Sequence, residues 1–234
     1  MIAVKASLMR GNTVLDSLPE IERRALFSSG KIVNLIAEQS IYDYGDSVKF
    51  LYFPFDAIFS TTTLMEDGSS AEISLIGSEG AVGIFAAFNE QTSRHWTSVL
   101  ISGYALKIDI ALLRQVLSES KALQTALLNS YRSLMTQVSQ RAVCNGRHSL
   151  AERLCFWLLL VHDRVKSNEI LLTHETIAKK LGARRAGVTN VAGTLQSSEI
   201  ISYSRGTISI LDRPAIEKCS CECHQAVRNA SNVN

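Results

Sequence analysis

The side chains best suited to specific chemistry stand in one short segment, at Arg185 and Asn190. A guanidinium can donate two hydrogen bonds to O6 and N7 of guanine, and a carboxamide can pair with adenine in the same bidentate way. Each such contact discriminates against a wrong base by about 1–3 kcal/mol. The chemistry that these residues predict is recognition of base edges in duplex DNA, without a covalent step.

Two helices joined by a tight turn must position these side chains. Thr173 can cap a first helix, and Gly182 is suited to end it. A second helix is expected from Ala183, because apolar residues recur there at positions i, i+3, i+4 and i+7: Val188, Val191, Ala192 and Leu195. Apolar residues then alternate around Ser204-Arg205-Gly206, which predicts a β-hairpin. Together these elements predict a winged helix-turn-helix.

Basic charge is concentrated in the same part of the chain. The segment 172–213 has six basic and three acidic residues, hence +3 (6 minus 3), whereas the whole chain carries only +2. A local concentration of positive charge is what attraction to DNA phosphates requires. A helical hairpin with a solvated basic edge, without any DNA partner, would show the same concentration of charge. Gly187 and Gly193 lie inside the second helix, where glycine is unfavourable. Close approach to DNA or tight packing on a neighbouring helix would explain them.

The first half of the chain has the pattern of a β-domain. Six short β-rich runs lie before Asp109, and Asp67-Gly68 between two of them is a hairpin signal. Many short strands at this spacing predict a barrel or a double-sheet jelly roll. A capping-box pattern that begins at Ser17 predicts a helix over residues 16–29. The fold class is therefore α+β.

A long helix is expected over residues 109–144, which contain neither proline nor glycine, and Asn145-Gly146 is expected to end it. Its apolar residues recur with the 4-3-4 spacing of a seam between two helices: Leu127, Tyr131, Leu134 and Val138. A helix packed on its own β-domain would show the same pattern. The predicted parts are an N-terminal helix and jelly-roll domain (1–108), a dimerisation helix (109–144), a winged helix-turn-helix (145–216) and a tail with cysteines (217–234).

This order of parts resembles the Crp-Fnr superfamily of bacterial transcription regulators. Four stretches carry the resemblance: Leu51-Tyr52-Phe53-Pro54, Glu66-Asp67-Gly68, Gly77–Gly83 and Leu172–Leu211. The resemblance implies a cyclic-nucleotide-binding-type jelly roll, a homodimer formed through the long helix, and two recognition helices that read a two-fold symmetric operator. The implied partners are double-stranded DNA, a second copy of the chain and RNA polymerase. A membrane is not expected as a partner.

The resemblance also assigns roles to individual positions. Arg185, Ala186 and Asn190 would face the bases, while Arg184, Thr189, Ser204 and Arg205 would position the DNA backbone. With the capping residue of the first helix, the expected DNA-binding set is Thr173, Arg184, Arg185, Ala186, Thr189, Asn190, Ser204 and Arg205.

The family's effector site is only partly present. Cyclic-nucleotide binders of the superfamily place a glutamate for the ribose directly after a glycine that matches Gly83, but here Ile84 follows. Their phosphate-binding arginine falls at or beside Ser93 and Arg94. Gly83, Ser93 and Arg94 are therefore the candidate effector-binding residues, for an unknown effector. A cyclic nucleotide is not expected, and the sequence establishes no cofactor. The first cysteine is Cys144, so an amino-terminal iron–sulfur cluster is not expected either.

A group of thiophilic residues lies near the C-terminus: Cys219, Cys221, Cys223 and His224. These residue types suit zinc or a redox switch, which makes a metal- or redox-responsive sensor the alternative function. If this segment is helical, Cys221 points away from Cys219 and Cys223. One ion would then need a non-helical loop or a ligand from elsewhere. The favoured interpretation is a closing helix with apolar thiols on the core, and no metal site. Cys144 and Cys155 are also expected in the core.

The sequence shows no catalytic constellation. The glycines of Gly77–Gly83 lack the Lys-Ser/Thr of a phosphate loop, and His95, His148 and His162 have no evident third partner. The protein is therefore expected not to be an enzyme. Five cysteines without an export signal predict reduced thiols in the cytoplasm.

Overall fold

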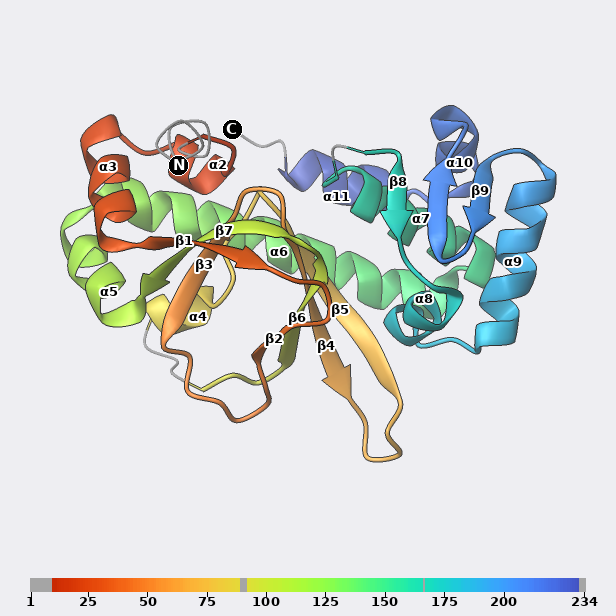
Figure 1. Cartoon of the computed structure of the whole chain (residues 1–234), viewed down its shortest axis with the longest axis horizontal. Helices are drawn as coiled ribbons and strands as arrows, with labels where there is room; N and C mark the ends of the chain where they lie inside the picture. Colours follow the sequence, from red (N-terminus) through yellow and green to blue (C-terminus); the bar gives the residue numbers. More distant parts are fainter. Residues whose placement is uncertain (1–9, 89–91, 166, 232–234) are drawn as a thin grey trace. The chain divides into compact units, whose positions relative to one another are not determined.

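The structure is a computed structural model that describes residues 10–88, 92–165 and 167–231, and the chain divides into two units (Figure 1). Unit 1 comprises Met1–Thr61 and Ile76–Met135, and unit 2 comprises Thr62–Leu75 and Thr136–Asn234. Within the described residues, no helix combines the length and the apolar character that crossing a membrane requires.

The described part of the chain before α5 (Ile110–Glu119) is built mainly on short strands, as the sequence predicts. An antiparallel three-stranded sheet has the order β1-β7-β3, with β1 Lys31–Leu35, β7 Gly103–Asp109 and β3 Phe50–Pro54. A four-stranded sheet has the order β2-β6-β4-β5, with β2 Ser40–Tyr42, β6 Trp96–Ile101, β4 Ile58–Leu64 and β5 Ser70–Ile76. The two open sheets confirm the double-sheet alternative and exclude a closed barrel. Phe53, Phe59 and Leu106 are fully buried in their core.

The N-terminal helix differs from the prediction over residues 16–29. The chain forms two helices, α2 (Thr13–Asp16) and α3 (Glu20–Ser29). Asn12 caps α2, whereas Pro19 precedes α3 without a side-chain cap, so the predicted capping box does not form. The reason is that Ser17 already serves as the C-cap of α2, and its hydroxyl donates to a carbonyl of that helix.

The segment predicted as one helix over 109–144 also forms two, α5 (Ile110–Glu119) and α6 (Lys121–Arg147). Ser120 separates them with an extended backbone, and its hydroxyl accepts a hydrogen bond from the Leu123 amide at 2.9 Å, as an N-cap does. At the other end, α6 continues through Asn145-Gly146, where a break was predicted. A single helical glycine costs only about 1 kcal/mol, which favourable interactions elsewhere along the helix can offset.

Unit 2 is organised around α7 (Leu150–His162), which is buried from Leu154 to Val161. Its predicted capping box is present, because Ser149 and Glu152 exchange side-chain-to-backbone hydrogen bonds. The other elements are β8 (Glu169–Leu171), α8 (His174–Leu181), α9 (Arg185–Ser197), β9 (Ile201–Ser204), β10 (Thr207–Ile210), α10 (Arg213–Cys219) and α11 (Cys223–Ser231).

A buried ion pair lies inside unit 2. Nη1 of Arg141 is 3.2 Å from Oε1 of Glu72, and Nε1 of Trp157 donates to the same oxygen at 2.7 Å. Burial lowers the pKa of Arg141, and the negative charge of Glu72 opposes this shift. Both charged side chains are almost completely buried, so each depends on the other for its solvation.

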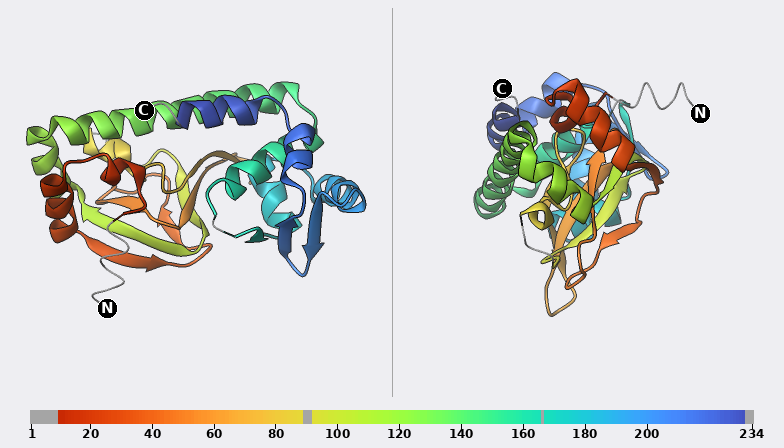
Figure 2. Two further views of the ribbon diagram at one scale, coloured as in Figure 1. Left: turned by 90° about the horizontal axis from the view of Figure 1, so that it is seen from above. Right: turned by 90° about the vertical axis from the view of Figure 1, so that its left-hand side faces the viewer.

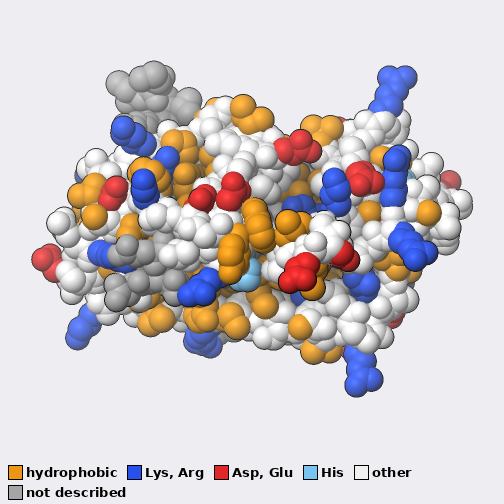
Figure 3. Space-filling view, turned by 90° about the horizontal axis from the view of Figure 1, so that it is seen from below, with side chains coloured by type: hydrophobic (Ala, Val, Ile, Leu, Met, Phe, Trp, Pro, Cys, Tyr) orange, Lys and Arg blue, Asp and Glu red, His pale blue; other side chains and the backbone are white. Residues whose placement is uncertain are grey.

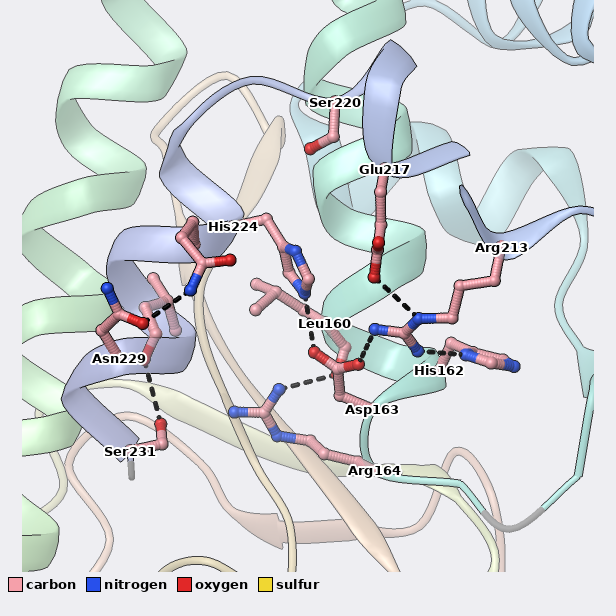
Figure 4. Close-up of polar contacts among 12 residues, drawn as sticks. Leu160, His162, Asp163, Arg164, Arg213, Glu217, Ser220, His224, Asn229 and Ser231 are labelled. Carbon is pink, nitrogen blue, oxygen red and sulfur yellow. Dashed lines mark hydrogen bonds and ion pairs between the residues drawn. The ribbon is translucent and has the colours of Figure 1, made fainter. Parts of the chain in front are cut away.

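A second polar cluster joins α10 and α11 to the end of α7 (Figure 4). Asp163 accepts hydrogen bonds from Nη2 of Arg213 at 2.5 Å and from Nε2 of His224 at 2.7 Å. Nε of Arg213 also donates to Glu217 at 2.9 Å. Burial raises the pKa of Asp163, but the hydrogen bonds from His224 and Arg213 outweigh it and lower that pKa to about 2.

Candidate nucleic-acid interface

The predicted helix-turn-helix is confirmed as α8, a tight turn and α9. The hydroxyl of Thr173 accepts a hydrogen bond from the Thr176 amide at 3.1 Å and so caps α8. Gly182 ends α8 with a φ of +57°, in the left-handed region that glycine adopts without strain. The apolar faces of both helices are buried: Ile177, Ala178 and Leu181 on α8, and Val188, Ala192 and Leu195 on α9.

The opposite face of α9 is exposed. At 100° per residue, Arg185, Thr189, Gly193, Ala186 and Asn190 lie within an arc of about 140°, and all five are exposed. Figure 2 shows α9 at the surface of unit 2, with the β9–β10 hairpin beside it. The residues predicted to face the bases are therefore accessible, and they point from the N-terminal half of a helix that a major groove can admit.

The predicted hairpin is also present. Ser204 pairs with Thr207, and the two residues between them, Arg205 and Gly206, have φ values of +51° and +81°. Two successive left-handed residues are typical of a type I′ turn. Ser204 and Arg205 are both exposed at the tip. A further strand, β8, pairs with β10 and gives the sheet order β8-β10-β9; its three residues are too few to show alternation in the sequence.

His174 was not singled out from the sequence, yet it connects three elements of this interface. Its ring stacks on Tyr203 of β9 with the ring centroids 3.9 Å apart, and its Nδ1 lies 3.1 Å from Oγ1 of Thr189 on α9. Nε2 is buried and has no hydrogen-bond partner among the described residues. Burial lowers the pKa of His174, and the positive charge of Arg185 lowers it further. His174 therefore positions Thr189 and the hairpin relative to α8.

The charge of +3 overstates the positive charge that α8, α9 and the hairpin present. Lys180 is held by a hydrogen bond to Thr62 at 3.4 Å, and its pKa is lowered by burial. Arg213 belongs to the Asp163 cluster. In α8, α9, the turn between them and the hairpin, three exposed arginines have no ion pair with a described residue: Arg184, Arg185 and Arg205. On the face drawn in Figure 3, the described Lys and Arg side chains are scattered rather than gathered into one patch.

The two glycines of α9 have different surroundings. A Cβ added to Gly187 would lie 2.9 Å from Cδ2 of Leu150, so Gly187 allows α9 to pack closely on α7. A Cβ added to Gly193 would meet no atom within 4 Å, and Gly193 lies at the centre of the exposed arc. Close packing on Leu150 therefore accounts for Gly187, whereas no contact among the described residues accounts for Gly193.

The predicted dimer-seam residues of α6 are partly or completely covered by the chain itself. Leu127 is completely buried, and Tyr131 and Leu134 pack against the core of unit 1, while Val138 is half-buried. The 4-3-4 pattern therefore marks the face that packs on the chain's own core. About a quarter turn away, α6 exposes three large apolar side chains, each at least 40% exposed: Leu128, Met135 and Val143.

Two of the candidate effector residues, Gly83 and Ser93, contact neighbouring residues of the chain itself. Gly83 precedes the short helix α4 (Ile84–Ala87) with a φ of +87°, and a Cβ there would lie 2.8 Å from the Tyr42 hydroxyl. Ser93 donates to the His95 carbonyl at 2.7 Å. Arg94 is exposed, and Ile84 is buried. Gly83 is therefore explained by its backbone conformation and close packing, without a ligand.

The C-terminal cysteines do not lie on one helix. Cys219 ends α10, Cys221 lies in the break before α11, and Cys223 begins α11. His224 is bound to Asp163, so the predicted group of four does not come together. Cys221 and Cys223 instead lie beside two residues that the sequence did not connect with them, Cys144 and His148.

Comparison with known proteins places these features in context. Residues 152–219 match the model of the Crp-like helix-turn-helix domain. The global nitrogen regulator of Synechococcus elongatus is 20% identical over 190 residues, which cover 77% of this chain and 85% of that protein. The global nitrogen regulator of Synechocystis sp. is 22% identical over 190 residues, which cover 77% and 84%.

Solved structures share the fold at low sequence identity. FixK2 from Bradyrhizobium japonicum has a TM-score of 0.71 and 14% identity, covering 82% of this chain and 98% of that one. A putative transcriptional regulator of the crp/fnr family from Eubacterium rectale has a TM-score of 0.66 and 18% identity, covering 88% and 96%. The likeness extends over both units and not only over the helix-turn-helix.

Proposed function

We propose that the chain is a transcription regulator of the Crp-Fnr type, which binds DNA through its Crp-like helix-turn-helix domain and reads its operator with α9. In this proposal, α9 lies in the major groove, and Arg185, Ala186 and Asn190 face the base edges. The single observation that carries the proposal is the exposed face of α9, where an arginine and an asparagine with bidentate capacity stand five residues apart.

The remaining exposed polar groups would hold the DNA backbone. Arg184 and Thr189 flank the base-facing residues, and Ser204 and Arg205 form the hairpin tip. Thr173 lies at the N-terminus of α8, where backbone amides and the helix dipole favour a phosphate. These contacts would fix orientation without reading sequence.

We further propose that the protein acts as a homodimer. The exposed apolar stripe of α6, Leu128, Met135 and Val143, supports an α6–α6 contact because a second copy would remove these side chains from water. Two recognition helices related by a two-fold axis would read half-sites about 34 Å apart. RNA polymerase is the expected further partner, from the resemblance alone.

A selection on random duplexes tests this function. The purified chain should enrich a two-fold symmetric site, with binding that weakens as salt increases. Arg185→Ala should lose the enrichment at the base pair that Arg185 reads and at its symmetry mate, whereas Arg24→Ala, which removes the same charge from an exposed position on α3, should retain the full site. If the wild type enriches no sequence with or without added metal ions and nucleotides, the proposal is wrong.

A further inference from the structure

Unit 2 contains three thiols and an imidazole in one buried cluster: Cys144, His148, Cys221 and Cys223. Their ligand atoms all lie within 4.8 Å of one another. The three cysteines are buried, and the His148 side chain is 15% exposed. Cys144 lies in the last turn of α6 and His148 directly follows that helix, while Cys221 lies in the break between α10 and α11 and Cys223 begins α11.

We propose that this Cys3His cluster binds one zinc ion, or another thiophilic divalent cation of the same size. Three cysteines and one histidine are a common ligand set of structural zinc sites. In such a tetrahedral site, Zn–S bonds of about 2.3 Å and a Zn–N bond of about 2.0–2.1 Å separate two sulfurs by about 3.8 Å, and a sulfur from a nitrogen by about 3.6 Å.

The observed distances are close to these values. The sulfurs of Cys144 and Cys221 are 3.6 Å apart, and the Cys223 sulfur lies 3.5 Å from Nδ1 of His148. Since no pair of ligand atoms exceeds 4.8 Å, the four need to close by at most about 1 Å around an ion. Four ligand atoms this close surround a single ion and leave no room for a cluster of several irons.

Two neighbouring side chains occupy the positions of outer-shell partners. Nε2 of His148 lies 3.4 Å from a carboxylate oxygen of Glu222, which leaves Nδ1 directed at the cluster. A carboxylate on the far nitrogen is the usual means of orienting a metal-binding histidine. Nε2 of Gln140 donates to the Cys223 sulfur at 3.1 Å, as an amide does to a metal-bound thiolate.

The ion would stabilise the attachment of the C-terminal segment. Burial, followed by the neighbouring thiols, raises the pKa of Cys144, and burial raises that of Cys221 to about 11. Because a thiol binds a metal ion as the thiolate, binding would release thiol protons into water, so the affinity should rise with pH. Because the ligands come from two segments that are 73 residues apart (221 minus 148), the ion would join the end of α6 to the α10–α11 break.

Cobalt titration of the full chain tests the proposal. Reduced, metal-stripped protein should bind one Co²⁺ per chain, with the thiolate-to-cobalt charge-transfer absorption and the intense d–d bands of a tetrahedral site, and Zn²⁺ should displace the cobalt. Cys221→Ser and Cys223→Ser should each weaken Co²⁺ binding at least about tenfold. Cys155→Ser and Cys219→Ser remove thiols outside the cluster and should leave the spectrum unchanged.

Further measurements distinguish the loss of a metal ligand from misfolding, and metal binding from disulfide formation. His148→Cys should retain a tetrahedral spectrum with stronger charge-transfer absorption, which a merely unfolded variant would not show. Far-ultraviolet circular dichroism establishes whether each serine variant is folded. The proposal is overturned if folded Cys221→Ser keeps the full cobalt spectrum, if the wild type binds no cobalt, or if mass spectrometry finds Cys144 and Cys221 joined as a disulfide in protein prepared under reducing conditions.

Discussion

Replacing Gly193 by alanine should stabilise the protein and weaken its binding to DNA. No atom lies within 4 Å of the added Cβ, so the methyl group meets no clash in the chain. Alanine is favoured over glycine in a helix interior by about 0.8–1.0 kcal/mol. For a chain of this size, that gain corresponds to a melting temperature higher by about 2–4 °C.

The same methyl group stands at the centre of the face that would enter the major groove. Adding a methyl to a closely packed contact costs about 1–3 kcal/mol. At 1.4 kcal/mol per factor of ten, the affinity for the selected operator should fall by about five- to 150-fold. Thermal unfolding and fluorescence-anisotropy titration of a labelled operator measure the two effects on the same preparation.

Gly187→Ala is the matched control, because Gly187 is the other glycine of α9 and faces Leu150 instead of the exposed arc. It should gain less stability than Gly193→Ala, since the Leu150 side chain has to move, and it should keep its affinity for DNA. If Gly193→Ala binds the operator as tightly as the wild type, close approach of this helix face to DNA is refuted. A loss of stability would refute the description of Gly193 as an open helix position.

Two stability predictions concern the polar clusters of unit 2. Asp163→Asn should lower the free energy of unfolding by about 1–2 kcal/mol at neutral pH, a value reduced for partial exposure to solvent. The folded-state pKa of Asp163 is about 2, below the ordinary 3.8. Its contribution to stability is therefore nearly complete above about pH 4 and disappears as the pH falls toward 2. Over this range, the free energies of unfolding of the wild type and Asp163→Asn, measured in urea, should converge. Glu72→Gln leaves the buried guanidinium of Arg141 without its counter-charge and should cost about 3–5 kcal/mol, measured by the same method. An unchanged unfolding midpoint would contradict the buried ion pair.

The helix-turn-helix could be predicted from the sequence because its signals are local. Thr173 and Gly182 mark the ends of α8 by their own backbone chemistry, and the apolar period of α9 identifies its buried face. The exposed face, with Arg185 and Asn190, follows from the same period. Most strands before α5 could be placed for similar reasons, because turn residues bound them, but the three-residue strand β2 was not predicted.

Other features depend on tertiary packing and could not be predicted in this way. An apolar period shows that one face of α6 is covered, but it does not show which part of the protein covers that face. Leu127 of α6 packs in the core of its own unit. Ser120 divides the predicted long helix without any proline or glycine to signal the break. The sequence identifies Cys221 and Cys223 as thiophilic, but only folding brings them close to Cys144. Cys221 lies 77 positions after Cys144 in the chain.

The role of α9 as the sequence-reading element is tested most directly by measuring base preference in two arginine variants. After the operator has been selected, every single base-pair change in one half-site is titrated with wild-type protein, Arg185→Ala and Arg205→Ala, at several salt concentrations. Arg185→Ala should lose discrimination of about 1–3 kcal/mol at one base pair and its symmetry mate. Arg205→Ala should weaken all sites uniformly and reduce the salt slope by about 1. Uniform weakening by Arg185→Ala, with base preferences intact, would contradict the account.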